Sequence, residues 1–278
     1  GNLYAVNQTT KQVLVLPSGE IGFCNLFNIP WMTPTPASGP IAATATQDVT
    51  LDFITTRQWP GLHRAVMTVA GTTPFAPPSV PVNYTVTFLD VPDDHWADPF
   101  IHGLAGARVS RGCGSGNFCP DAELNRAEMA ILMVRAMHGP LYFPPDAVGI
   151  FVDVPISDTD RTASFVEQLY RDGVVAGCAQ GGGGELYYCP NELVSRAQMA
   201  VFVAAGSGIA PVDPPLGYFS DVHGTEYQWA EGFIEAIFNA GITAGCGNHM
   251  FCPGDNITRA QLAVWLVVEF DIPYLPGS

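Results

Sequence analysis

Asn125-Arg126-Ala127-Glu128-Met129 is the stretch that decides the fold, because two related stretches follow it in the chain. These copies read Ser195-Arg196-Ala197-Gln198-Met199 and Thr258-Arg259-Ala260-Gln261-Leu262. Each copy comes after a Gly-Cys step and a Cys-Pro step, at Gly112-Cys113 and Cys119-Pro120, Gly177-Cys178 and Cys189-Pro190, and Gly245-Cys246 and Cys252-Pro253. A unit that recurs in this way is a supersecondary module that buries its apolar face against copies of itself.

The units also begin alike, with Phe88-Leu89-Asp90-Val91, Phe151-Val152-Asp153-Val154 and Phe219-Ser220-Asp221-Val222. The opening aspartates are 63 and 68 residues apart. Apolar residues at helical spacing then occur twice in each unit, once before the cysteines and once after them. We therefore predict three helix–loop–helix repeats, with boundaries 88–147, 148–215 and 216–278.

The second helix of each repeat has a clear start signal. Asn125, Ser195 and Thr258 are favourable N-caps, and the Glu or Gln three residues later completes a capping box. An Arg occupies the first helical position in every copy, although the partial positive charge of a helix N-terminus disfavours a cation there. Some other group must therefore hold this Arg. The opening Asp of a repeat and an anionic ligand are the two alternatives.

The pattern Phe-x-Asp-Val…Trp…Gly…(Ser/Thr)-Arg-Ala-(Glu/Gln) resembles the S-layer homology (SLH) repeat, from about Phe88 to Phe270. The resemblance implies a pseudo-threefold helical unit and noncovalent attachment to cell-envelope polysaccharide in grooves between repeats. The groove residues that it implies are Asp90, Trp96, Arg126, Asp153, Arg196, Asp221, Trp229, Gly241 and Arg259.

The match is uneven among the repeats. Counting back from the first cysteine of each repeat, the second repeat has Arg161 where the others have Trp. The first repeat has Arg108 where the others have Gly173 and Gly241. We therefore expect at least one groove to be degenerate. The paired cysteines are a further departure from the common anchoring versions of the family.

Six of the seven cysteines flank the variable loop of a repeat, and the seventh is Cys24. Zinc binding is the rival interpretation, but the spacings are too wide for a Cys-x₂₋₄-Cys knuckle and no His is placed to complete one. We predict local disulfides, Cys113–Cys119, Cys178–Cys189 and Cys246–Cys252, and no metal. Disulfides imply an oxidising, extracellular location. Cys24 is either a small buried side chain or an intermolecular crosslink.

Residues 1–87 differ in character. Segments 12–16, 48–53, 63–69 and 82–86 alternate as half-buried strands do, with Gly and Pro between them. We expect an antiparallel β-sandwich, which resembles bacterial Ig-like domains of the BACON type around Pro30-Trp31 and Pro36–Gly39. Trp31 is then a core residue or a sugar platform. The linker to Phe88 is almost nil.

The chain has one lysine, ten arginines and a net charge of −15. This composition argues against nucleic acid and anionic membranes as partners, and no apolar run is long enough for a membrane span. Neutral glycans, calcium and sister subunits remain. The Asp90–Asp94 loop is a solvated turn or, alternatively, a calcium site; we otherwise expect no cofactor.

No catalytic constellation is recognisable in the sequence. The expected function is therefore that of a secreted, non-enzymatic surface protein anchored to envelope polysaccharide. The alternative is a structural subunit that assembles into a surface layer or filament, with the repeats as packing modules.

Overall fold

The computed structural model describes residues 2–7, 12–16, 32–35, 50–53, 61–68 and 79–274. The chain divides into two compact units, 1–87 and 88–278. The sequence placed the start of the helical repeats at the same position, and only Thr87 separates the last strand from Phe88. Cys24, Trp31 and the segment 36–39 lie outside the described residues.

The first unit contains strands β1 (Asn2–Asn7), β2 (Gln12–Leu16), β3 (Met32–Thr35), β4 (Thr50–Phe53), β5 (Gly61–Thr68) and β6 (Ser79–Val86). They form a sheet of order β2-β1-β5-β6 and a separate β3–β4 pair. The expectation of a wholly antiparallel arrangement is wrong for one pair, because β1 and β5 run parallel, with Leu3 opposite Val66. Residue alternation defines the faces of a strand but not its neighbour. The Ig-like sandwich stays a prediction.

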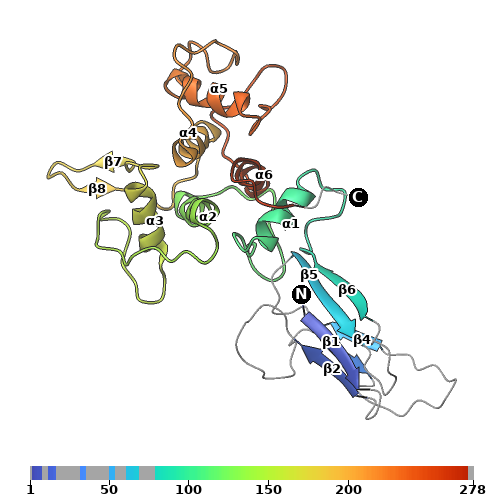
Figure 1. The fold of residues 1–278 in the computed structure, drawn as a ribbon. Coiled ribbons are helices and arrows are strands. Elements are labelled where there is room, and N and C mark those ends of the chain that lie inside the picture. The colour runs from blue at the N-terminus through green and yellow to red at the C-terminus, as the bar shows by residue number, and fades with distance from the viewer. Residues whose placement is uncertain are drawn as a thin grey trace. The chain divides into compact units, whose positions relative to one another are not determined.

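The second unit contains helices α1 (Asp98–Gly106), α2 (Arg126–His138), α3 (Thr162–Arg171), α4 (Arg196–Ser207), α5 (Glu231–Asn239) and α6 (Arg259–Glu269). A 3₁₀ turn, η1 (Gln228–Ala230), precedes α5, and a small hairpin of β7 (Ala179–Gln180) and β8 (Leu186–Tyr187) fills the longest cysteine loop. Figure 1 shows α2, α4 and α6 end-on at the centre, with α1, α3 and α5 outside them.

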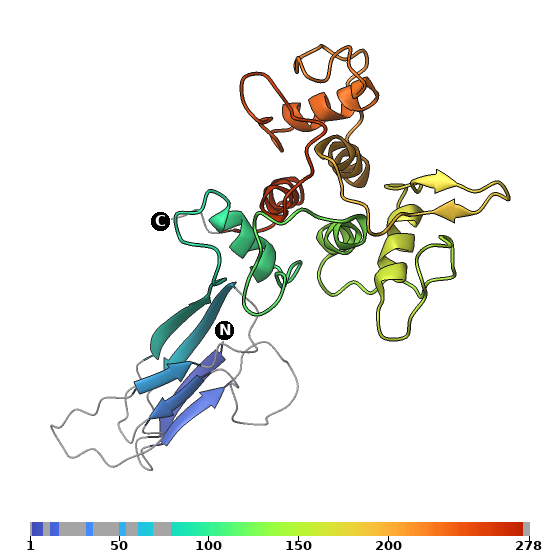
Figure 2. The same ribbon diagram turned by 180° about the vertical axis from the view of Figure 1, so that it is seen from behind.

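The helices pair across repeat boundaries. The second helix of each repeat packs against the first helix of the next, which gives the pairs α2–α3, α4–α5 and α6–α1 (Figures 1 and 2). The last pair joins the third repeat to the first, so the unit closes into a ring. Each lobe of the structure therefore consists of the second helix of one repeat and the first helix of the next, so its boundaries fall in the middle of the repeats predicted from the sequence.

The ring has a common apolar centre. Met129, Met133, Met199, Leu262 and Leu266 of the inner helices are fully buried in one core cluster. All three predicted capping boxes are present, and so each inner helix begins where the sequence indicated.

A cycle of backbone hydrogen bonds joins the segments just before these helices. Leu124 N donates to Ile257 O, Val194 N to Leu124 O, and Ile257 N to Val194 O, at 3.2, 3.0 and 2.9 Å. Every repeat is therefore tied to both others at the N-terminal end of the inner helices.

Candidate functional site at the seams between repeats

The three motif arginines are buried, with 4%, 4% and 8% of Arg126, Arg196 and Arg259 exposed. Each Nε donates to a backbone carbonyl of the following repeat: Arg126 to Tyr188 at 2.7 Å, Arg196 to Phe251 at 2.9 Å, and Arg259 to Phe118 at 2.8 Å. Each guanidinium also lies over the ring of that same residue, 4.7 to 5.0 Å from its centroid. The arginines therefore hold the ring together at its three seams.

The opening aspartates bind the same three aromatic residues from the other side. The Asp90 carboxylate accepts the backbone N–H groups of Phe118 and Cys119 at 2.7 and 2.6 Å. Asp153 accepts those of Tyr188 and Cys189, both at 2.7 Å.

Asp221 accepts the N–H groups of Phe251 and Cys252 at 2.9 and 2.7 Å. Among the described residues, no ion pair joins a motif arginine to an opening aspartate. The two side chains meet instead at one aromatic residue, with Asp on its N–H and Arg on its C=O.

Burial and nearby carboxylates act in opposite directions on the pKa of two of these arginines. Burial lowers the pKa of Arg196, and the nearby charges of Asp255 and Asp221 oppose that shift. Burial likewise lowers the pKa of Arg259, against the charges of Glu128 and Asp90. A guanidinium stays protonated at neutral pH despite such shifts, so each seam contains a buried positive charge.

Two of the three motif arginines have a hydrogen-bond donor without a partner. The Nη2 atoms of Arg126 and Arg196 are buried and have no hydrogen-bond partner. An unsatisfied buried donor costs about 1–3 kcal/mol. What holds these two arginines is therefore the hydrogen bond from Nε to a backbone carbonyl and the contact with the aromatic ring, while Nη2 is buried without a partner.

The predicted tryptophans are on the surface. Trp96 is 60% exposed and Trp229 is 56% exposed, just before the helical residues of α1 and α5. Arg161, the counterpart in the second repeat, instead binds Asp146 at 3.1 Å and the carbonyl of Pro144 at 2.6 Å. Two repeats therefore offer an open aromatic face, and the second offers a partly exposed ion pair.

Gly241 has a backbone role that explains its recurrence. It follows α5 with a φ of +76°, and a Cβ there would meet nothing within 4 Å. Gly173 and Arg108 follow α3 and α1 with φ of +75° and +61°. The position requires a left-handed backbone, which Gly adopts most readily. Whether Gly241 contacts a ligand stays a prediction.

The three predicted disulfides are present, with Cα–Cα distances of 5.9, 6.0 and 6.0 Å. The second cysteine of each pair is left-handed, and its N–H is one of those that the opening Asp accepts. The opening Asp therefore lies beside the disulfide, forming the groups Asp90/Cys113/Cys119, Asp153/Cys178/Cys189 and Asp221/Cys246/Cys252. Sequence reasoning missed this proximity, although its signal was the recurrence of Phe-x-Asp-Val before every cysteine pair.

The segment 90–94, for which calcium binding was one of two alternatives, forms a turn, and calcium binding there stays a prediction. The Asp90 carboxylate already accepts hydrogen bonds from two backbone N–H groups. Asp93 and Asp94 are exposed, and among the described residues neither belongs to a cluster of three potential metal ligands. His95 N donates to Pro92 O at 2.9 Å, which makes this segment a turn.

Sequence reasoning also missed two buried glutamates that bind the connectors between repeats. Glu167 accepts the N–H groups of Val148, Gly149 and Ile150 at 2.7–3.0 Å, and Glu235 accepts those of Leu216 and Tyr218. Glu167 and Glu235 lie at the same distance in the sequence after the equivalent positions Arg161 and Trp229, and this shared spacing could have revealed them.

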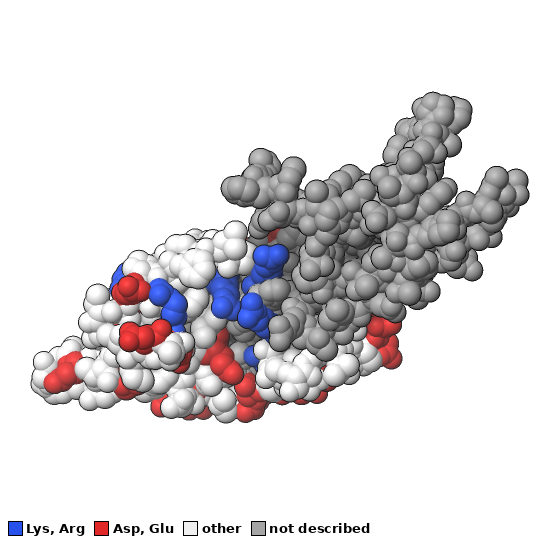
Figure 3. All heavy atoms as spheres, turned by 90° about the horizontal axis from the view of Figure 1, so that it is seen from below, with Lys and Arg blue, Asp and Glu red and all other residues white. Residues whose placement is uncertain are grey.

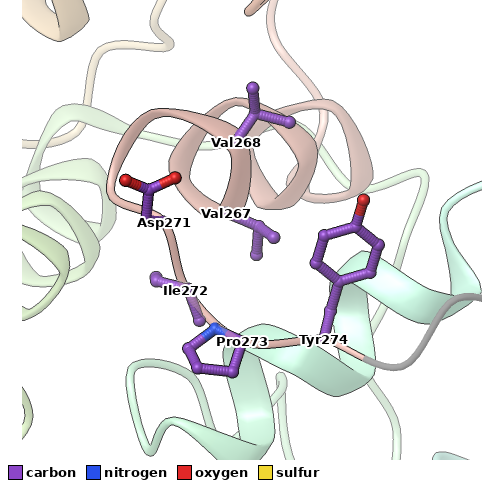
Figure 4. A pocket seen from close by; sticks show the side chains of 6 residues that line it. All are labelled: Val267, Val268, Asp271, Ile272, Pro273 and Tyr274. Atoms are coloured by element: carbon purple, nitrogen blue, oxygen red, sulfur yellow. The ribbon is translucent and has the colours of Figure 1, made fainter.

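Two surface features lie apart from the seams. An open hollow of about 410 Å³ at the end of α6 is lined by the residues labelled in Figure 4 and contains none of the predicted site residues. On the face of the helical unit seen in Figure 3, several basic side chains lie close together, with acidic side chains among and below them. Arg135 is half-buried, and its pKa is lowered first by burial and then by the nearby charge of Arg111.

None of the helices in the described residues is both long and apolar enough to cross a membrane.

Two segments of the chain match the model of a known family. Residues 87–130 and 218–263 match the S-layer homology domain, one in the first repeat and one in the third. The middle repeat lies outside the two matches but makes the same aspartate and arginine contacts.

Among curated proteins, the S-layer protein sap of Bacillus anthracis is 29% identical over 182 residues, covering 65% of this chain and 21% of the relative. An S-layer protein of Bacillus thuringiensis subsp. finitimus is 28% identical, with the same coverage. An endoglucanase of a Bacillus species is 31% identical over 122 residues, covering 42% of this chain and 12% of the relative. The chain spans about a fifth of the length of these S-layer relatives.

Proposed function

We propose that this protein is a secreted surface protein whose helical ring attaches noncovalently to cell-envelope polysaccharide. One observation carries the proposal: each of the two SLH-matched segments presents a tryptophan that is more than half exposed, Trp96 in one and Trp229 in the other. A flat indole on the surface offers an apolar face on which a sugar ring can stack, with its N–H available to a hydroxyl.

The seams support this surface from within rather than contact the glycan, because the unpartnered Nη2 atoms of Arg126 and Arg196 are buried. The disulfides and the S-layer relatives support a location outside the cell.

We propose no catalytic role. Of the histidines described, His102, His138 and His223 each bind a different carboxylate at 2.7–2.8 Å: Asp98 within α1, Asp172 at the end of α3 and Glu231 at the start of α5. The similarity to an endoglucanase covers only 12% of that enzyme and is compatible with a shared attachment segment.

The test is binding of purified envelope polysaccharide to Trp229→Ala, compared with wild type by titration calorimetry. Stacking on one aromatic face contributes on the order of 1 kcal/mol, so we expect roughly fivefold weaker binding. Phe143→Ala is the matched control, because Phe143 is an exposed aromatic residue on a connector. Unchanged binding by Trp229→Ala and Trp96→Ala, or no binding by wild type, would overturn the anchoring proposal.

Arginine substitutions are poor probes of binding here. Because the motif arginines hold the ring together, their loss weakens folding and binding at the same time. Arg161→Ala is more informative: its side chain is 42% exposed, and we expect it to weaken polysaccharide binding less than Trp229→Ala does.

Self-assembly is the second candidate. The connectors between repeats expose large apolar side chains, Leu141, Phe143, Val148 and Leu216, each more than 70% exposed. Exposed apolar groups of this kind are typical of surfaces that pack against another protein. Electron microscopy of the purified protein would show layers or filaments if this function holds, and polysaccharide binding by a strictly monomeric protein would reject it.

A further inference from the structure

We propose that each cysteine loop is a latent site for a thiophilic divalent cation, Zn²⁺ or Cd²⁺, which forms when its disulfide is reduced. The ligands would be the two thiolates and the opening Asp of the same repeat, with water in the fourth position. This inference concerns Asp90, Asp153 and Asp221 and is independent of the proposed attachment to polysaccharide.

The three ligand atoms already lie close together. In each repeat, one carboxylate oxygen and the two Sγ atoms lie within 4.8 Å of one another. A Zn–S bond is about 2.3 Å and a Zn–O bond about 2.0–2.2 Å, so ligands on one tetrahedral ion are roughly 3.5–3.8 Å apart. After reduction the sulfurs need only separate by rotation of their side chains, because the backbone already holds the two Cα atoms about 6.0 Å apart.

The Asp is oriented as a ligand should be. Its two oxygens each accept one backbone N–H at 2.6–2.9 Å, which fixes the plane of the carboxylate. Each oxygen keeps a lone pair for a metal ion. Hydrogen bonds from a second shell commonly orient metal-binding carboxylates in this way.

The loops are also accessible. Cys113, Cys178 and Cys246, the first cysteines of the three pairs, are exposed to solvent, so a reductant and a hydrated cation can reach them. The second cysteines are half-buried and held in a left-handed backbone by the hydrogen bond to Asp. One ligand is thus fixed and the other can move.

The chemistry balances when the reductant is a thiol or a phosphine. With a water-soluble phosphine, the S–S bond breaks, phosphorus is oxidised to the phosphine oxide with the oxygen of one water, and the two protons of that water go to the sulfurs. The cation then displaces these two protons. A disulfide beside Asp has a formal charge of −1, and two thiolates, one carboxylate and a divalent cation also sum to −1. The cation therefore replaces the crosslink without changing the charge of the loop.

Spacing alone had excluded zinc, since the cysteines are 6, 11 and 6 residues apart and no histidine is placed to complete a site. The third ligand comes instead from the opening of the repeat, about 23 to 25 residues before the first cysteine. The fold, rather than the local sequence, brings it to the pair.

The experiment uses the full chain with Cys24→Ala, so that every thiol belongs to a loop. The protein is reduced with phosphine, freed of excess reductant without oxygen, and titrated with Cd²⁺ while the thiolate-to-cadmium ultraviolet band is recorded. We expect saturation at three equivalents, one for each group. Cys113→Ser/Cys119→Ser should remove one equivalent, and the oxidised protein should show no band.

The Asp ligand is tested by Asp90→Asn, with Asp93→Asn as the control in the same loop. We expect Asp90→Asn to leave two sites unchanged and to weaken the third by at least about tenfold, since even second-shell changes act on that scale. Asp93→Asn should bind like the parent.

Two results would overturn the proposal: absence of a stoichiometric band, or equal cadmium affinity in Asp90→Asn and the parent. If the reduced protein loses structure without metal, and Cd²⁺ then restores the circular dichroism of the parent more completely than that of Asp90→Asn, the proposal holds, because binding is coupled to folding.

Discussion

Replacing Arg259 by Ala should destabilise the helical ring more than the same change at Arg126 or Arg196. All three arginines make the same hydrogen bond and lie over the ring of the same residue, and Arg126 and Arg196 also lie near a second ring, Phe202 at 5.5 Å and Trp265 at 5.4 Å. Arg259 differs because it joins the third repeat to the first, across 141 residues of chain. Arg126 and Arg196 join consecutive repeats, across 62 and 55 residues. The effect of Arg259 therefore falls on the one seam that no connector spans.

The magnitude follows from the interactions that each guanidinium makes. A hydrogen bond from a charged donor contributes about 1.5–3 kcal/mol, and a buried cation–π interaction about 1–2 kcal/mol. Removing both thus costs about 2.5–5 kcal/mol before other terms. At Arg126 and Arg196 the substitution also loses the more distant second ring, about 0.5–1 kcal/mol, but removes a buried, unpartnered Nη2, which returns about 1–3 kcal/mol. We expect a net destabilisation of about 2.5–5 kcal/mol for Arg259→Ala and about 1 kcal/mol less for each of the other two.

Urea unfolding of the full chain, followed by the helical circular dichroism signal, measures these differences in the free energy of unfolding. All helices of the described residues belong to the 88–278 unit, so this signal reports on the ring. Arg161→Ala is the control, since its pair with the highly exposed Asp146 should contribute no more than about 1 kcal/mol. A destabilisation by Arg259→Ala equal to or smaller than that by Arg196→Ala would refute the reasoning.

Three further outcomes are expected. Peptide mapping without reductant should recover the three local disulfides, and their reduction should lower the melting temperature in steps. The disulfide that closes the 11-residue loop should contribute about 0.5 kcal/mol more to stability than either disulfide of a 6-residue loop. A melting temperature that reduction leaves unchanged would contradict a stabilising role of the disulfides. Asp221→Ala removes two charge-assisted hydrogen bonds and should cost about 2–4 kcal/mol in urea unfolding, whereas Glu226→Ala, at an exposed position, should stay within about 0.5 kcal/mol. Gly241→Ala should destabilise and Arg108→Gly stabilise the protein by about 1 kcal/mol each, because both residues have positive φ; the same sign for both would reject a purely backbone role.

Local features were predictable from the sequence because their physics is local. The capping boxes at Asn125, Ser195 and Thr258 need only residues three positions apart, and all three formed as expected. The disulfides span short loops, and their pairing followed from the spacing of the cysteines. The recurrence of Arg against the helix dipole also signalled correctly that a partner lay outside the helix.

The identity of distant partners required the tertiary structure. A helical repeat shows which face of a helix is apolar but not which helix covers it, so the pairing of α6 with α1 could not be foreseen. The same limit applies to β1, whose parallel neighbour β5 lies more than 50 residues away. It applies again to Arg259, whose partner is the carbonyl of Phe118, since every residue has a carbonyl and no side-chain pattern marks the one that is used. Sequence thus determined the repeat, its caps and its crosslinks, while closure of the ring decided which buried donors find a partner and which do not.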